Sequence, residues 1–166
     1  MLKKKICLVG HFGVGKTSLL RRFVDNMYED TYLTTVGVVI RKKDSVVASK
    51  PLTMMLWDMA GKDDLAEVKL SHLTGASGYI LVADGCRAVT LATAVQLQEK
   101  ITQLFGPLPF VLAVNKSDLA PKWELQRSDI EACGWTSFDT SAKLGTGVEE
   151  MFMGLAEKLV AGDPGE

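Results

Sequence analysis

The sequence predicts an α/β fold in which helices cover both faces of a mostly parallel sheet, and two observations support the prediction. Short, nearly continuous apolar runs occupy residues 6–9, 78–84 and 110–114, which is typical of strands buried on both faces of a parallel sheet. Between and after them, apolar residues recur at three- and four-residue steps, as they do on one face of a helix. Strands that alternate with helices in this way favour a parallel sheet.

Taken in order, the elements amount to six strands and five helices in a single domain, residues 1–166. Strands are predicted at residues 6–9, 37–43, 52–58, 78–84, 110–114 and 135–140. Helices are predicted at residues 16–27, at the end of the charged segment 60–69, and at 89–105, 128–133 and 148–160.

Two polar segments complete the first half of the chain. Residues 28–36 are polar and threonine-rich, so we expect a loop there. The strands on either side of Asp44 and Ser45 follow one another directly, and we expect them to form the one antiparallel pair. A polar turn around these two residues and a second turn at residues 49–51 would join them.

Composition and charge exclude several classes of function. The net charge of −1 gives no electrostatic reason to expect nucleic acid or an anionic membrane as a partner. Cys7, Cys86 and Cys133 lack metal-ligand spacing, so we expect reduced thiols. No run of about 18 apolar residues and no secretory signal is present. We therefore expect a soluble, cytoplasmic monomer.

The clearest motif is GHFGVGKTS at residues 10–18, between the first strand and the first helix. Gly10, Gly15, Lys16 and Thr17 fit the pattern G-x-x-x-x-G-K-[ST], in which backbone N–H groups wrap around phosphates. The lysine then contacts the β- and γ-phosphates, and the threonine hydroxyl binds Mg²⁺. The alternative is a glycine-rich turn with a solvent-facing lysine. We expect nucleotide contacts from Gly10, Phe12, Gly13, Val14, Gly15, Lys16, Thr17 and Ser18.

The choice of base is predicted at the ends of two later strands, where open α/β sheets bind their ligands. Asn115, Lys116 and Asp118 follow one strand, and residues 141–143 (Ser141, Ala142, Lys143) follow the last. A carboxylate at Asp118 can accept hydrogen bonds from the ring N–H and the exocyclic amine of guanine, whereas adenine offers no such pair. A backbone N–H in the 141–143 segment can donate to guanine O6. Such a site rejects adenine, because the carboxylate would otherwise remain unpaired.

With these motifs in order, the chain resembles a small GTPase of the Ras superfamily. The matching segments are the phosphate loop at 10–17, Thr35 in the first switch, D-x-x-G at 58–61, N-K-x-D at 115–118 and S-A-K at 141–143. The resemblance covers nearly the whole chain. It implies a Ras-like G domain, a phosphate-loop NTPase fold that binds GTP or GDP with Mg²⁺ and acts as a molecular switch in signalling.

Within the superfamily, the Rab branch is the most similar. Residues 35–38 (TVGV) resemble its T-I-G-V, residues 57–58 its W-D, and residues 75–76 its G-A after the second switch. The stretch 141–152 resembles its S-A-K…V-E…F pattern. One departure is the pair at 72–73, His and Leu, where the branch has two tyrosines.

The resemblance assigns further roles. Tyr28 would pack against the guanine, and the alkyl stem of Lys116 would lie along the base and ribose. The Thr35 hydroxyl would complete the Mg²⁺ shell beside Thr17, while Asp58 would hold the ion through a water. The resemblance also implies that the loops around Thr35 and residue 61 order with GTP and relax with GDP. Those loops would meet protein effectors and an exchange factor or activating protein.

Two departures fall at the chemistry, for which we expect Lys16, Thr35, Gly61 and Lys62 to be the catalytic residues. The Gly61 N–H would touch the γ-phosphate. Lys62 replaces the glutamine that usually orients the attacking water, and protonated lysine donates hydrogen bonds but cannot accept one. Phe12 replaces a small residue beside the γ-phosphate and would crowd an incoming arginine. We therefore expect slow hydrolysis; in the alternative, Phe12 turns outward and Lys62 is solvated.

Three functions remain open at this point. The first is a guanine-nucleotide switch with slow hydrolysis. The second is a nucleotide-stabilised binding scaffold with negligible hydrolysis, which Lys62 and Phe12 favour. The third, an ATP-dependent enzyme, is opposed by Asp118. A last departure concerns residues 162–166, which lack cysteine, and Leu2, so we expect neither prenylation nor myristoylation, and no direct membrane anchor.

Overall fold

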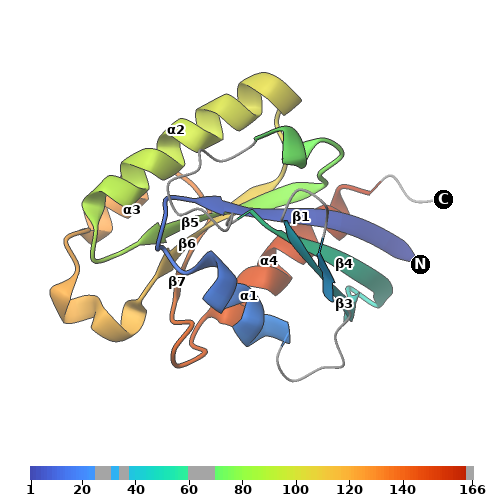
Figure 1. The fold of residues 1–166 in the computed structure, drawn as a ribbon, viewed down its shortest axis with the longest axis horizontal. Coiled ribbons are helices and arrows are strands. Elements are labelled where there is room, and N and C mark those ends of the chain that lie inside the picture. The colour runs from blue at the N-terminus through green and yellow to red at the C-terminus, as the bar shows by residue number, and fades with distance from the viewer. Residues whose placement is uncertain (25–30, 34–37, 60–69, 164–166) are drawn as a thin grey trace.

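The computed structural model describes residues 1–24, 31–33, 38–59 and 70–163. Within these residues a seven-stranded sheet, in the order β2-β3-β4-β1-β5-β6-β7, forms the centre of the molecule (Figure 1). The strands are β1 (Leu2–Gly10), β2 (Thr31–Leu33), β3 (Val39–Val47), β4 (Lys50–Asp58), β5 (Gly78–Asp84), β6 (Phe110–Asn115) and β7 (Ser137–Thr140).

Helices lie on both faces of this sheet. The α-helices are α1 (Lys16–Val24), α2 (Ala88–Phe105), α3 (Arg127–Ala132) and α4 (Val148–Ala161), and two 3₁₀ helices are η1 (Leu70–Leu73) and η2 (Ser117–Lys122). Figure 1 shows α1 and α4 together on one side of the strands and α2 and α3 on the other. The predicted α/β class with both faces covered is therefore confirmed.

The alternation of side chains along β1 explains why the chain needs helices on both sides. Ile6 and Leu8 belong to the core beneath α1 and α4, whereas Cys7 and Val9 belong to the core beneath α2 and α3. Successive side chains of a strand point to opposite faces, so a strand buried on both faces becomes a continuous apolar run. All four side chains are fully buried.

The carboxyl ends of five strands lie at the same edge of the sheet, because β1, β4, β5, β6 and β7 all run in the same direction. β1 pairs in parallel with β4 and β5, and β6 pairs in parallel with β5 and β7. Among the described strands, β3 alone runs opposite to its neighbours β2 and β4, as predicted for a single antiparallel strand. The register then aligns Asn115 with Asp84 on one side and with Thr140 on the other. Polar strand ends thus gather where the phosphate loop leaves β1.

The turn predicted around Asp44 and Ser45 is wrong. β3 continues through both residues, and Asp44 faces Thr53 across the β3–β4 pair, where the Thr53 hydroxyl donates a hydrogen bond of 2.6 Å to Asp44 Oδ1. The chain reverses later, at Ala48 and Ser49, which adopt φ values of 49° and 65°. Positive φ at both central residues matches the twist of a tight hairpin, so the polar pair lies inside the strand.

Other boundaries differ by smaller amounts. Within the predicted loop 28–36, residues 31–33 form the short edge strand β2, which pairs with β3. The last strand begins at Ser137 rather than at residue 135. The short helix expected within residues 60–69 lies outside the described residues, as does the predicted end of the first helix at residues 25–27.

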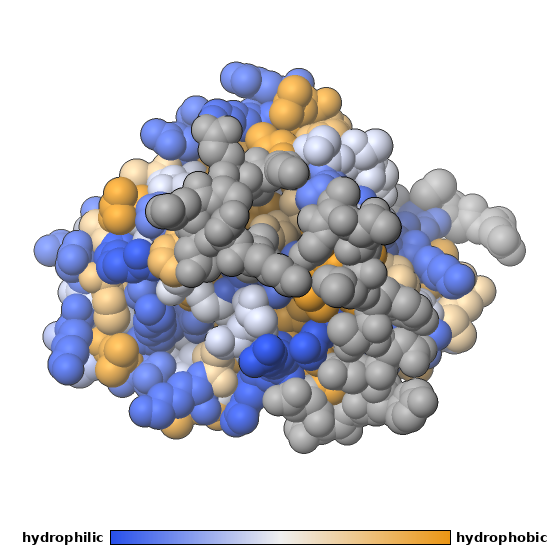
Figure 2. Space-filling model, viewed as in Figure 1, coloured by the Kyte–Doolittle hydropathy of each residue, from blue (hydrophilic) through white to orange (hydrophobic). Residues whose placement is uncertain are grey.

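The two ends of the described chain lie near each other (Figure 1), and Lys4 Nζ forms an ion pair of 2.8 Å with Asp163. Hydrophilic and hydrophobic residues alternate in small groups over the face drawn in Figure 2. In the described part of the chain, no helix is both long enough and apolar enough to cross a bilayer.

Candidate functional site

The glycine loop follows β1 directly and turns into α1, and each of its three glycines has a structural reason. Gly13 and Gly15 have φ values of 74° and 101°, a region that side chains with a Cβ rarely adopt. Gly10 packs against the backbone of Val82 so closely that a Cβ would overlap its carbonyl oxygen. Two glycines therefore serve the curvature of the loop and one serves its contact with the sheet.

Lys16 is held inside this loop. Its ammonium group donates hydrogen bonds to the carbonyl oxygens of Gly10, at 3.0 Å, and His11, at 3.2 Å, and the residue is only 6% exposed. Burial lowers the pKa of Lys16, and the negative charge of Asp58 acts in the opposite direction. A buried ammonium group thus faces the backbone of the loop that was predicted to bind phosphate, which rules out a solvent-facing lysine.

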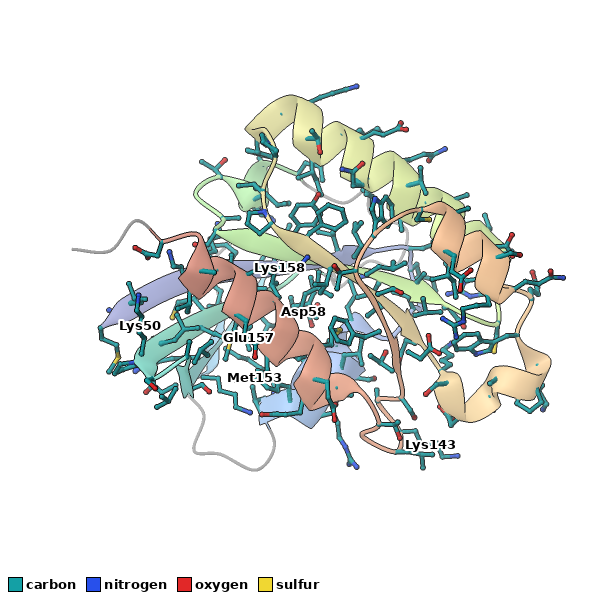
Figure 3. The ribbon with its side chains drawn as sticks, turned by 180° about the vertical axis from the view of Figure 1, so that it is seen from behind. Lys50, Asp58, Lys143, Met153, Glu157 and Lys158 are labelled. Carbon is teal, nitrogen blue, oxygen red and sulfur yellow. The ribbon has the colours of Figure 1, made fainter. Side chains whose placement is uncertain are left out.

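Thr17 and Asp58 form the second part of the site. The Thr17 hydroxyl, in the first turn of α1, donates a hydrogen bond of 2.6 Å to Asp58 Oδ2 at the end of β4. Asp58 is 4% exposed, and Figure 3 shows it in the interior of the molecule. A hydroxyl and a carboxylate are the hard oxygen ligands that Mg²⁺ prefers, and Mg²⁺ sites commonly use only one or two carboxylates. The residues present therefore fit this ion.

Asn115 joins the phosphate loop to the segments predicted to bind the base. Its amide nitrogen donates to the carbonyl oxygen of Val14 at 2.9 Å. Its amide oxygen accepts hydrogen bonds from the Thr140 hydroxyl, at 3.2 Å, and from the backbone N–H of Ala142, at 3.3 Å. A Cβ at Gly15 would overlap the same amide. One buried side chain thus fixes three segments relative to one another.

The base segments are also bonded to each other. Asp118 Oδ1 accepts a hydrogen bond of 2.8 Å from the Ser141 hydroxyl, which in turn accepts one of 3.0 Å from the N–H of Leu144. Lys116 adopts the left-handed conformation, with φ of 71°, and this reverses the chain between β6 and η2. The N-K-x-D and S-A-K segments therefore form one connected unit.

These segments surround a cavity of about 470 Å³, a volume within the range of small-molecule sites. The lining residues are Gly13, Gly15, Ser18, Asn115, Lys116, Asp118, Leu119, Ala142 and Lys143. Every one except Leu119 was predicted from the sequence. Figure 3 shows Lys143 on the loop between β7 and α4. Tyr28, Thr35, Gly61 and Lys62 lie outside the described residues.

The sequence prediction missed Asp84. This residue ends β5 and is 1% exposed. Its Oδ2 accepts Lys116 Nζ at 2.7 Å and Arg87 Nε at 3.1 Å, and its Oδ1 accepts the N–H of Cys86 at 2.9 Å. Burial alone would raise the pKa of Asp84, but these hydrogen bonds together outweigh it and lower the pKa. Its position at a strand end beside Asn115 was the available signal.

Two further residues support the site from outside the predicted motifs. Arg87 Nη2 donates a hydrogen bond of 2.7 Å to the carbonyl oxygen of Phe12, whose side chain is 52% exposed. The Trp123 indole N–H donates to the carbonyl oxygen of Lys116 at 2.8 Å, and its ring covers Gly85. Neither residue belongs to a short sequence motif. Arg87 bonds to a residue 75 positions before it, and Trp123 to a residue 7 positions before it.

The sheet order, the glycine loop and the oxygen pair define a phosphate-loop α/β protein. The family model described as "Ras family" matches residues 5–161, nearly the whole chain. This chain therefore belongs to the Ras family of GTP-binding, switch-type GTPases. Proteins of this family bind guanine nucleotides with Mg²⁺ and interact with regulators and effectors.

Proposed function

We propose that this chain is a guanine-nucleotide switch that binds GDP and GTP with Mg²⁺, hydrolyses GTP slowly, and engages protein effectors through the segments around Thr35 and Gly61. One observation carries the proposal: Asn115 bonds the phosphate loop, through Val14, to the S-A-K segment, through Ala142. A ligand in the common cavity would contact both groups of residues at once. A guanine nucleotide has a base and phosphates at the two ends of one molecule and suits that arrangement.

Guanine selection is assigned to Asp118. Its carboxylate lines the cavity, and the Ser141 hydroxyl holds one oxygen in place. The ring N–H and exocyclic amine of guanine would donate to this carboxylate, while adenine would leave it without donors. Because an unpaired carboxylate in a confined site is costly, the preference for guanine should be strong. Tyr28 and Lys116 are assigned to the faces of the base.

Thr17, Thr35 and Asp58 are assigned to the metal. Thr17 and Asp58 already lie within hydrogen-bond distance of each other, and Thr35 would add a third oxygen when GTP is bound. Bound Mg²⁺ would offset the negative charge of the phosphates. Lys16 adds a positive charge from within the loop, and the remaining loop residues contribute backbone N–H groups.

Slow hydrolysis is inferred from Lys62 and Phe12. A protonated lysine cannot accept a hydrogen bond from the attacking water, so the water is poorly oriented. The half-exposed ring of Phe12 lies on the phosphate loop, where an activating arginine would approach. The same two residues favour a second candidate, a nucleotide-bound scaffold without turnover. The paired oxygens of Thr17 and Asp58 favour the switch. With them, the metal shell would gain the Thr35 oxygen when GTP is bound and lose it with GDP, whereas a permanently bound nucleotide would need no such change.

The finer assignment to the Rab branch is supported by residues 35–38 and 75–76. With it we propose a single-domain monomer in the cytoplasm, regulated by an exchange factor or an activating protein, with no role in nucleic-acid binding. The net charge of −1 supports the last part.

The proposal is tested by denaturing the purified protein and identifying the released nucleotide by chromatography. Bound GDP supports the switch, since it indicates turnover during growth. Bound GTP supports the scaffold or a switch that depends on an activating protein, because the site then binds GTP and barely hydrolyses it. If the protein is purified empty, titration with fluorescent GDP and ADP analogues decides, and a lack of preference for the guanine nucleotide would refute the proposal.

A further inference from the structure

The guanidinium group of Arg87 connects the phosphate loop to a buried carboxylate. Nη2 donates to the carbonyl oxygen of Phe12 at 2.7 Å, and Nε donates to Asp84 Oδ2 at 3.1 Å. Arg87 immediately precedes α2, so its backbone is anchored between β5 and that helix. A single rigid fork therefore joins the phosphate loop to Asp84, and its bond to Phe12 spans 75 residues of the sequence. Arginine suits this position because its donors have a fixed geometry.

The contact with the Phe12 carbonyl determines where the next N–H points. The peptide bond between Phe12 and Gly13 is trans, and in a planar trans peptide the C=O and N–H groups point in opposite directions. Holding the carbonyl oxygen on Arg87 therefore turns the Gly13 N–H away from the guanidinium group. Gly13 lines the cavity, so an N–H turned in this way would be available to a phosphate there.

The approach of Arg87 to the loop is close. A Cβ at Gly13 would lie 3.3 Å from Arg87 Nη2, tighter than an ordinary contact. A charged donor also makes a stronger hydrogen bond than a neutral one, and hydrogen bonds in series polarise one another. The Gly13 N–H is thereby made a better donor as well as a fixed one.

Asp84 extends this connection to the base segment. The oxygen that accepts Arg87 Nε also accepts Lys116 Nζ at 2.7 Å, and Lys116 lines the same cavity. Asp84 is buried, while the side chains of Arg87 and Lys116 are each 36% exposed. The carboxylate thus holds both cations, one from the phosphate side and one from the base side.

We propose that Arg87 is a positioning residue for the nucleotide: it orients the Gly13 N–H toward the phosphates, fixes Lys116 through Asp84, and so determines how long the nucleotide remains bound. The inference rests on the proposed guanine-nucleotide function. It adds a residue outside the recognised motifs that controls nucleotide release.

The test compares Arg87→Ala and Arg87→Lys with a matched control, Arg127→Ala. Arg127 forms an ion pair of the same chemistry with Asp139, but on the surface and away from the cavity lining. Each protein is loaded with a fluorescent GDP analogue in Mg²⁺, and release is followed after excess GDP is added. Arg87→Ala should release the analogue about tenfold faster than wild type. The release rate of Arg87→Lys should fall between those of wild type and Arg87→Ala, since lysine retains the positive charge but lacks the two fixed donors of the guanidinium group.

A second readout separates positioning from general loosening. The ³¹P NMR resonances of bound GDP should shift in Arg87→Ala, because the phosphate loses an oriented donor, and should remain unchanged in Arg127→Ala. Unchanged release and unchanged resonances in Arg87→Ala would overturn the inference, as would faster release with unchanged resonances. If wild-type protein itself fails to bind the GDP analogue, the proposed function fails and the inference with it, which distinguishes the two failures.

Discussion

Thr17 and Asp58 lie 41 positions apart in the sequence, yet a hydrogen bond of 2.6 Å joins them. The pair brings together the first turn of α1, directly after the phosphate loop, and the end of β4, where the D-x-x-G motif begins. A hydroxyl and a carboxylate in contact bring together two of the hard oxygen groups that Mg²⁺ prefers.

Replacing Thr17 by alanine should abolish much of the Mg²⁺ dependence of nucleotide binding. The variant loses one oxygen ligand, so we expect at least about tenfold weaker Mg²⁺ binding. The measurement is the rate of GDP release at increasing Mg²⁺ and after addition of EDTA. Thr17→Ser retains the hydroxyl and serves as the control. A Thr17→Ala protein with the Mg²⁺ response of wild type would contradict the assignment of the metal site.

Changing Asp118 to asparagine should shift preference from guanine to xanthine. The donor and acceptor at position 2 of the ring are exchanged between the two bases, and the amide supplies a donor where the carboxylate accepted. Asparagine retains an oxygen that can accept the hydrogen bond from Ser141, so the segment should keep its structure. Competition between GDP and xanthosine diphosphate measures the shift. A variant that still prefers GDP would refute the contact.

Hydrolysis should become faster when Lys62 is replaced by glutamine and Phe12 by glycine. Glutamine both donates to and accepts from the attacking water, and glycine opens the approach to the phosphates. Single-turnover hydrolysis of bound GTP should accelerate about tenfold or more in the double variant. Lys100→Gln makes the same lysine-to-glutamine change at an exposed position of α2, away from the cavity lining, and serves as the control. An unchanged rate would remove the basis for slow intrinsic hydrolysis.

The contribution of Asp84 to stability should depend on pH. Folding lowers the pKa of this carboxyl group, so its stabilisation is present above the pKa of the unfolded chain, about 3.9, and is lost as pH falls through the lower folded value. Near neutral pH, Asp84→Asn should lower the free energy of unfolding by about 3 kcal/mol, the lower end for a buried ion pair, because Arg87 and Lys116 are partly exposed. That difference should shrink below about pH 4.

Urea unfolding of both proteins between pH 7 and pH 3 measures the effect. Asp139→Asn, which removes an exposed partner of Arg127, should cost no more than about 1 kcal/mol at neutral pH. An Asp84→Asn difference that is as large at pH 3 as at pH 7 would show that charge is not the source of the stabilisation.

The fold was largely predictable because its signals are local. The apolar runs of β1, β5 and β6 are unbroken, which is typical of strands that are buried on both faces. The glycine loop motif in turn requires a strand before it and a helix after it. The predicted turn at Asp44 failed because a polar pair can also occupy the middle of a hairpin strand. β2 was missed because three residues give no periodicity of their own and gain their hydrogen bonds from β3.

Site residues that belong to a sequence motif could be predicted. Site residues that take part only through contacts between distant parts of the chain could not. Eight of the nine residues that line the cavity belong to predicted motifs. Asp84, Arg87 and Trp123 were missed because each interacts with atoms brought near only by the fold. The strand-end rule that selected Asn115 applies equally to Asp84, its register partner. Arg87 offered no comparable signal, because its acceptor on Phe12 is a backbone oxygen.

Trp123 has a practical consequence. Its indole N–H is bonded to the carbonyl oxygen of Lys116, and its ring rests on Gly85, so the polarity around this fluorophore follows the conformation of the N-K-x-D segment. Trp57 and Trp135 pack elsewhere, against Lys5 and Phe110, and a variant with phenylalanine at both positions would retain Trp123 as its only tryptophan. The remaining tryptophan emission then provides an intrinsic optical reading of this segment, in real time and without an attached dye.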